Sequence, residues 1–363
     1  NMAAGLGGAG KGHGIAADNG GFDLGGGKPC HRKGGDTGFG DEFGGCSTSP
    51  SGLGSGAGQG RTDDGARGVE HGHAARRDFV EVLAPHHVEA IEWHWETRMA
   101  QRRGEQPPHL AYFPIWSRGH MKSTVARRIV VCDAALSGSG YCLYASGTQK
   151  KVKGHATSIE ALLRLSTIRK YYPELAEVSR NEQGASKGWT ADFLNTKHGY
   201  VFHFVGLDQG IAGANVEDVR PTLIVPVDID DRENSPVISE SRMHVFTRSL
   251  LPTRQAGTLV FFAQNLIADH TVMNQIHSGQ ARLLTNRKPT QPIPAIINLA
   301  TETREVDGIV KDIIVAGEPT WEFYGVARCQ EEIDTIGLEA FEAECQHEID
   351  KQRAELIMAS FDE

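Results

Sequence analysis

The pattern of hydrophobic and polar positions divides the chain into two unequal stretches. In residues 1–75 the apolar side chains show almost no regular spacing. From residue 78 onward, short apolar runs alternate with segments in which apolar positions recur every three or four residues. Apolar runs are typical of buried strands, and the longer spacing is typical of amphipathic helices. The alternation predicts an α/β domain with a mostly parallel central sheet flanked by helices.

The expected elements follow in a regular order along the chain. Strands are expected at 109–115, 140–146, 189–194, 199–205, 223–227, 257–265, 281–285 and 309–315. Helices are expected after Pro85 and at 121–136, 148–164, 235–250 and 270–278. The strands at 189–194 and 199–205 are expected to pair as an antiparallel hairpin. Helices from 321 to 361 are expected to bury Leu338, Phe341, Cys345 and Ile349.

Composition sets the N-terminal segment apart. Residues 1–75 hold 25 of the 43 glycines, and such a segment has too little apolar surface to offset the entropy of ordering it. We therefore expect a disordered Gly-rich tail. Residues 5–11 match the pattern GxxxxGK, but the next residue is Gly12 rather than a hydroxyl residue, and no strand is expected before the match. This match is not expected to bind nucleotide.

Charge and cysteine content narrow the function classes. The net charge of −9 argues against a uniformly basic surface, so nucleic acid would be contacted by a local patch or a channel between subunits. The lysines at 150, 151 and 153 fit a solvated helix face, with DNA contact as the alternative. The six cysteines form no CxxC pair, which fits a reducing compartment. No hydrophobic run approaches the ~18 residues of a membrane span, so we expect an intracellular protein without membrane contact.

The stretch 114–124 carries the clearest chemistry. A strand, a tight turn and a helix that opens with Lys122 are the setting of a phosphate-binding loop. The free N–H groups and the dipole of a helix start favour an anion there. We expect nucleotide to contact Ser117, Arg118, Gly119, His120, Met121, Lys122, Ser123 and Thr124. Lys122 would lie along the terminal phosphates, and the Ser123 hydroxyl would bind Mg²⁺. In the alternative interpretation, the same strand, turn and helix leave Lys122 merely solvated.

A second landmark lies about 100 residues downstream. The apolar run 223–227 delivers Asp228, with Asp230, Asp231 and Glu233 just beyond. Ligands bind at this edge of open α/β sheets, and a nucleotide hydrolase needs carboxylates there for Mg²⁺ and for the attacking water. Gln264 ends the strand expected beside this one and is placed to sense the terminal phosphate. The alternative is a solvated acidic loop.

Taken together, these stretches resemble the large subunit of the bacteriophage terminase, the genome-packaging motor. The resemblance covers roughly 79–363 and is carried by 83–87, 117–124, 145–149, 206–215, 220–225 and the strand that ends at Gln264. The family's loop has an arginine near its start and no glycine at that first position, which accounts for Arg118. The resemblance implies a P-loop NTPase fold (RecA/ASCE-like), with phosphates held by Lys122 and Arg118. It also implies Mg²⁺ on Ser123, and Gln264 in the motif that couples hydrolysis to motion.

The function implied is that of an ATPase motor that drives double-stranded DNA into a procapsid. The expected cofactors are ATP and Mg²⁺, and the expected partners are phage DNA, the portal protein and the small terminase subunit. The motor would work as a homo-oligomeric ring on the portal, in the host cytoplasm. Residues 78–320 would form the ATPase domain. Residues 321–363 resemble the lead-in to a nuclease domain, but they hold no strand-borne acidic cluster, so no nuclease activity is expected.

One departure from the family leaves the metal position open. Terminases usually end this strand with two adjacent acids, whereas here Val227 precedes Asp228. Either Asp228 is the second acid and the metal position is apolar, or Asp228 holds the metal. In the second case Asp230 or Asp231 orients the water, since Asp230 lies on the same side of an extended strand. Arg118 is the expected arginine that stabilises the transition state. A helicase-like P-loop ATPase and a packaging module without turnover are the alternative functions.

Overall fold

The structure is a computed structural model, and it describes residues 83–349 except 182, 185–188 and 210–218. The Gly-rich segment 1–75 and the end of the expected C-terminal helices lie outside the described residues. No helix in the described part of the chain is long and apolar enough to cross a membrane.

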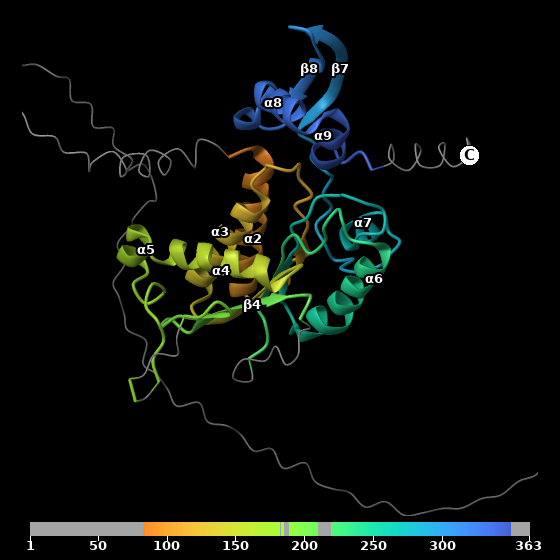
Figure 1. Cartoon of the computed structure of the whole chain (residues 1–363). Helices are drawn as coiled ribbons and strands as arrows, with labels where there is room; N and C mark the ends of the chain where they lie inside the picture. The colour runs from red at the N-terminus through yellow and green to blue at the C-terminus, as the bar shows by residue number, and fades with distance from the viewer. Residues whose placement is uncertain (1–82, 182, 185–188, 210–218, 350–363) are drawn as a thin grey trace, which may run out of the picture. The chain divides into compact units, whose positions relative to one another are not determined.

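The centre of the described domain is a six-stranded, mostly parallel sheet, as the alternation predicts (Figure 1). Its strands are β1 (Ala111–Tyr112), β2 (Gly140–Ser146), β3 (Phe193–Asn195), β4 (Tyr200–Gly206), β5 (Leu223–Pro226) and β6 (Leu259–Phe261). They lie in the order β1-β6-β5-β2-β4-β3, and only β3 runs antiparallel to its neighbour. The predicted hairpin of β3 with β4 is confirmed, although β3 begins at Phe193 rather than 189.

Helices cover both faces of this sheet (Figure 1). They are α2 (Pro85–Arg102), α3 (Lys122–Ser137), α4 (Gln149–Leu163), α5 (Ser166–Tyr171), α6 (Pro236–Val245) and α7 (Val272–His277). A π-helical turn, η1 (Phe246–Leu250), and a 3-10 turn, η2 (Leu251–Thr253), continue α6. Local sequence explains the helix starts: the Thr148 hydroxyl accepts the Lys151 N–H at the start of α4, and Ser235 caps α6 just before Pro236.

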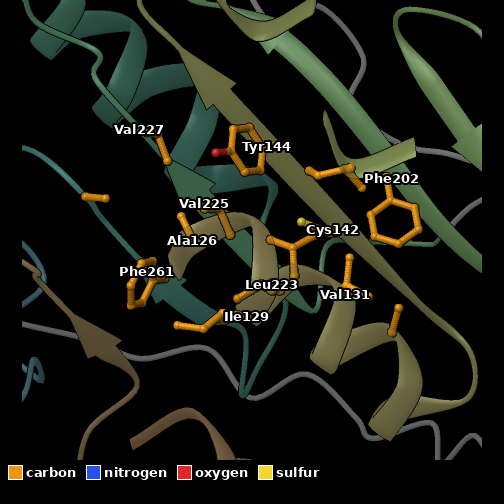
Figure 2. Packing of buried hydrophobic residues seen from close by; sticks show 14 of the residues in the cluster. Ala126, Ile129, Val131, Cys142, Tyr144, Phe202, Leu223, Val225, Val227 and Phe261 are labelled. Atoms are coloured by element: carbon orange, nitrogen blue, oxygen red, sulfur yellow. The ribbon is translucent and has the colours of Figure 1, made fainter. Parts of the chain in front are cut away.

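Two hydrophobic layers enclose the sheet because the central strands are apolar on both sides. In β2, Cys142 and Tyr144 face α3 and α4, while Tyr141 and Leu143 face the layer that contains Phe246. Figure 2 shows the first layer, in which α3 packs on the residues of β2 and β5. Burial on both faces is typical of parallel strands covered by helices.

A buried polar network joins α2, α3 and β4 beneath this layer. The Asp133 carboxylate receives hydrogen bonds from Arg98 Nε at 2.5 Å, His94 Nε2 at 2.8 Å and the Tyr200 hydroxyl at 2.5 Å. Burial raises the pKa of Asp133, but the His94 hydrogen bond and the Arg98 charge outweigh it and lower the pKa to about 2. A buried carboxylate is stable only with partners of this kind. The network therefore fixes the position of α2 relative to α3, the helix that begins with Lys122.

The remaining described elements form a separate layer with its own core. They are β7 (Ile296–Val306), β8 (Ile309–Pro319), the 3-10 turn η3 (Glu322–Tyr324), α8 (Val326–Ile336) and α9 (Leu338–Cys345). The antiparallel strands β7 and β8 are joined by Asp307-Gly308, both at positive φ. The prediction at 309–315 is confirmed within β8, whereas the strand expected at 281–285 is wrong and β7 was missed. An Asp-Gly pair between two β-type segments is a strong hairpin signal, so the sequence carried the missing information.

Close packing of β4 on α4 gives the first testable prediction. A Cβ atom on Gly206 would lie 2.1 Å from the backbone nitrogen of Gln149. We expect Gly206→Ala to lower the free energy of unfolding by about 1–3 kcal/mol, since a backbone atom has to move. Gly154→Ala is the matched control: nothing lies within 4 Å of its Cβ position in α4. The control should stabilise the protein by about 0.5–1 kcal/mol in urea unfolding, and equal effects of both changes would contradict the packing.

Candidate functional site

A cleft of about 1050 Å³ lies at the carboxyl ends of the parallel strands. The described residues that line it include nine of the residues predicted from sequence: Arg118, Gly119, Met121, Lys122, Ser123, Thr124, Asp228, Asp230 and Gln264. Parallel strands bring their carboxyl ends to one edge, so residues far apart in sequence meet there. Ser117 and His120 do not line the cleft, and their side chains are buried.

The loop from β1 to α3 turns through two residues with left-handed backbone. Gly119 has φ 83° and Met121, directly before α3, has φ 54°. A left-handed conformation costs a non-glycine residue about 1–2 kcal/mol, which explains why a glycine is common before such a lysine. The packing of the Met121 side chain offsets part of this strain. The side chain contacts the hydrophobic layer that contains α3 and α4, and also the core of the C-terminal layer. The N–H groups of Lys122, Ser123 and Thr124 begin α3 and have no acceptor within the helix.

Lys122 is held in a preformed position. Its ammonium group donates to the backbone oxygens of Trp116 at 2.8 Å and Ser117 at 3.0 Å, and the residue is 8% exposed. Burial lowers the pKa of Lys122 to about 8, although the nearby charge of Asp228 opposes this shift. In the described part of the chain no carboxylate forms an ion pair with it. An anion that entered the cleft would therefore meet a cation whose charge is not yet compensated.

Ser123 and Asp228 meet as predicted for a metal-binding pair. The Ser123 hydroxyl donates to the Asp228 carboxylate at 3.1 Å across a separation of 105 residues. Val227, by contrast, is fully buried and lies in the core near Tyr144 (Figure 2). Its apolar side chain is therefore not in the cleft, and Asp228 is the carboxylate beside the loop. One carboxylate and one hydroxyl suit Mg²⁺, which keeps several waters and takes further oxygens from phosphates.

Asp230 is tied to the fold rather than free in the cleft. Its carboxylate accepts the N–H of Val272 at 2.7 Å, where α7 begins, and burial raises its pKa to about 6. The premise that Asp228 and Asp230 lie on one extended strand is wrong, because β5 ends at Pro226 and Asp228 has φ 47°, although both residues line the cleft. Alternation of side chains holds only in extended backbone.

Gln264 is bound to the same acidic segment. Its side-chain oxygen accepts the backbone N–H of Asp230 at 3.3 Å, and its side-chain nitrogen donates to the Asp230 carbonyl, also at 3.3 Å. The amide thus links the end of β6 to the segment after β5. It lies at the cleft, as predicted.

The acid that faces Arg118, Glu344, was not predicted from the sequence. Glu344, on α9, lies 3.5 Å from the Arg118 guanidinium and 3.9 Å from that of Arg232, and it accepts from Asn265 at 3.3 Å. Its carbonyl also accepts the Arg118 N–H at 3.2 Å. Since 226 residues separate Arg118 from Glu344, no local pattern could predict the contact. The Arg118 side chain remains 64% exposed and free to meet another anion.

The side chain of His120 lies behind the loop, although we expected His120 to contact the nucleotide. Its ring is fully buried, stacks on His86 at 5.5 Å and contacts Trp321 and Tyr324. Burial lowers the pKa values of His120 and His86 to about 3, so both rings are neutral. His120 therefore packs the loop against the C-terminal layer, and only its backbone lies within the loop itself. The Ser117 hydroxyl likewise donates to the backbone, to the Arg118 carbonyl at 3.0 Å.

Comparison with known proteins adds a weak structural similarity. A solved structure described as "The Phi-28 gp11 DNA packaging Motor" is similar over 59% of this chain and 78% of that chain, with 10% identity and a TM-score of 0.27. A likeness of this size carries no argument about function. No protein-family model matches the chain, and no curated protein matches it.

Proposed function

We propose that this chain is a P-loop ATPase that couples hydrolysis of Mg-ATP to movement of double-stranded DNA. The observation that carries the proposal is the meeting of Lys122, Ser123 and Asp228 in one cleft at the carboxyl edge of a parallel sheet. These three residues are the minimum that phosphoryl transfer requires: a cation for the terminal phosphates, and a hydroxyl and a carboxylate for the metal. A solvated loop would not bury its lysine, and it would not place the next residue, Ser123, against an acid that follows another strand.

The strand order supports a RecA/ASCE-like version of the fold. β1, which leads into the loop, is separated from β5, which leads to Asp228, by β6 alone. Gln264 follows β6, so it lies between the loop and the acid. Residues 287–293 extend this edge, with parallel bridges of Arg287 to Ala111 and of Ile293 to Trp116.

The residues of the cleft divide the proposed chemistry among them. The first N–H groups of α3 bind the β- and γ-phosphates, and Lys122 moves from its two carbonyls to the γ-phosphate. Arg118 exchanges Glu344 for the same phosphate and stabilises the charge of the transition state. Ser123 and Asp228 would hold Mg²⁺, which would neutralise charge on the phosphates. Asp230 would orient the attacking water with the acceptor capacity that the Val272 N–H leaves unused.

The wider role follows from the sequence resemblance. We infer that the motor serves genome packaging, with double-stranded DNA, a portal protein and a small terminase subunit as partners, in a homo-oligomeric ring. Lys151 forms an ion pair with Asp231 at the cleft, so Lys150 and Lys153 are the lysines of α4 left for a DNA contact. Both belong to α4, which begins at Gln149 and lines the cleft with Lys151 and His155.

The test is Mg²⁺-dependent ATP hydrolysis with and without double-stranded DNA. Asp228→Asn should lower kcat about 100-fold or more, because the amide no longer supplies the negative charge that holds the metal. Asp312→Asn, on β8 and outside the cleft, is the control and should keep full activity. Tight Mg-ATP binding without turnover in the wild type would favour an assembly module instead. Separation of duplex strands would favour a helicase.

A further inference from the structure

His87 lies behind the phosphate loop and uses both ring nitrogens on backbone groups. Its Nδ1 accepts the N–H of Ala84 at 3.0 Å, and its Nε2 lies 3.0 Å from the carbonyl oxygen of His120. A backbone N–H can only donate and a carbonyl can only accept. The partners therefore require the neutral tautomer with hydrogen on Nε2, and this hydrogen is donated to His120.

The ring cannot turn away from this position. His87 is fully buried, and the rings of Trp116 and Trp321 each lie 5.0 Å from it, edge to face. Burial also lowers the pKa of His87, which keeps the ring neutral and its Nδ1 available to Ala84. The side chain is thus a rigid bridge from the first turn of α2 to a loop 33 residues further along the chain.

The bond to His120 orients one particular peptide group. In a trans peptide the C=O and the following N–H point in opposite directions. Because the carbonyl of His120 points at His87, the N–H of Met121 points away from α2. Met121 lines the cleft and has a left-handed backbone, with φ 54°. This backbone is strained, so without the hydrogen bond from His87 the peptide would relax and its N–H would point in another direction.

We propose that His87 is a positioning residue that holds the peptide between His120 and Met121 so that the Met121 N–H faces the phosphates of the nucleotide. The inference rests on the proposed function, because it assigns this N–H to the same phosphate site. His87 itself touches no nucleotide. His87 holds the strained turn in a conformation in which the Met121 N–H is ready to donate a hydrogen bond to an anion. It does so from α2, which lies outside the loop.

Three variants separate this role from simple packing. His87→Phe keeps an aromatic ring but removes the donor, and we expect the Kd for Mg-ATP to rise about 10-fold, the loss of one hydrogen bond to a charged group. His87→Gln restores an N–H donor at a similar reach and should bind within about 3-fold of the wild type. His86→Phe is the matched control, because the Nε2 of His86 has no partner among the described residues. It should bind Mg-ATP as the wild type does.

A second measurement does not depend on nucleotide. In protein labelled with ¹⁵N-methionine, His87→Phe should shift the Met121 amide resonance, and His86→Phe should shift it much less. If the phenylalanine variant does not fold, His87→Asn replaces it, since its shorter amide keeps an acceptor for Ala84 but does not reach His120. Wild-type protein that binds no Mg-ATP would refute the proposed function. The amide shift would still show whether His87 orients the peptide between His120 and Met121. Equal losses in His87→Phe and His86→Phe, or an unmoved Met121 amide, would overturn the inference.

Discussion

Lys122→Ala is expected to abolish ATP turnover, with a fall in kcat of at least about 100- to 1000-fold. The lysine is the buried cation of the cleft, preset by hydrogen bonds to the carbonyls of Trp116 and Ser117. Without it, the charge that develops on the γ-phosphate lacks its nearest positive partner among the loop side chains. In the proposed mechanism the N–H groups of α3 would still bind phosphate, so we expect nucleotide affinity to fall less than kcat does.

The fold should survive this change. Two carbonyl oxygens lose their donor, which costs about 1–3 kcal/mol. Removing an ammonium group that is 8% exposed offsets part of that cost, since the charge no longer has to be desolvated. Steady-state hydrolysis and thermal unfolding are measured on the same preparation, with Lys311→Ala on the exposed hairpin as the control. Wild-type turnover in the folded Lys122→Ala protein would show that this loop is not the phosphate site.

Stability is expected to fall steeply as the pH drops from about 6.5 towards 4. Five buried or half-buried histidines have pKa values that are lowered to about 4 or below: about 3 for His86 and His120, and about 4 for His155, His203 and His347. Burial is the first cause in each case. The histidines of the unfolded chain bind protons near their ordinary pKa of about 6.5, whereas those of the folded chain bind them only near the lowered pKa values. Below pH 6.5 the unfolded state therefore holds more protons, and stability is lost as the pH falls.

The size of this effect can be bounded. Each ring contributes about 1.4 kcal/mol per pH unit in this window, so His86 and His120 together account for about 3 kcal/mol per unit. A typical domain is stable by about 5–15 kcal/mol, and we expect unfolding near pH 5. Asp230 acts in the opposite direction between about pH 6 and 3.8, because burial raises its pKa, but it is one group against five.

Urea unfolding at pH 7, 6 and 5 measures this dependence. The double variant His86→Phe, His120→Phe removes two of the five rings. The free energy of unfolding should then depend less steeply on pH, by an amount that corresponds to about two protons. A midpoint that does not change between pH 7 and 5 would mean that the histidines are not buried in neutral form around the loop.

Much of the candidate site could be predicted because its signals are local. The strand, turn and helix around Lys122 are recognisable within eleven residues, and Asp228 follows its apolar strand directly. That Ser123 and Asp228 meet follows from a general property of parallel sheets, whose carboxyl ends share one edge. The predicted α/β sheet and most of its helices rest on the same periodic patterns.

Other features depended on contacts that no local pattern records. The sequence alone could not tell that Val227 faces the core, since the left-handed turn at Asp228 decides which side chains reach the cleft. Likewise, Asp230 is held by α7, and Glu344 reaches Arg118 from a helix near the end of the described chain. His87 contacts the loop only because α2 packs behind it.

The sequence by itself therefore determined the class of fold, the loop and the acid that faces it. Each of these depends on residue types at short spacing, and short spacing dictates local backbone and side-chain direction. Only the tertiary structure decided which polar groups are held by other elements and which remain open to a ligand. Those assignments depend on packing between segments tens to hundreds of residues apart, and this packing placed His87 against the backbone of His120 and Glu344 beside Arg118.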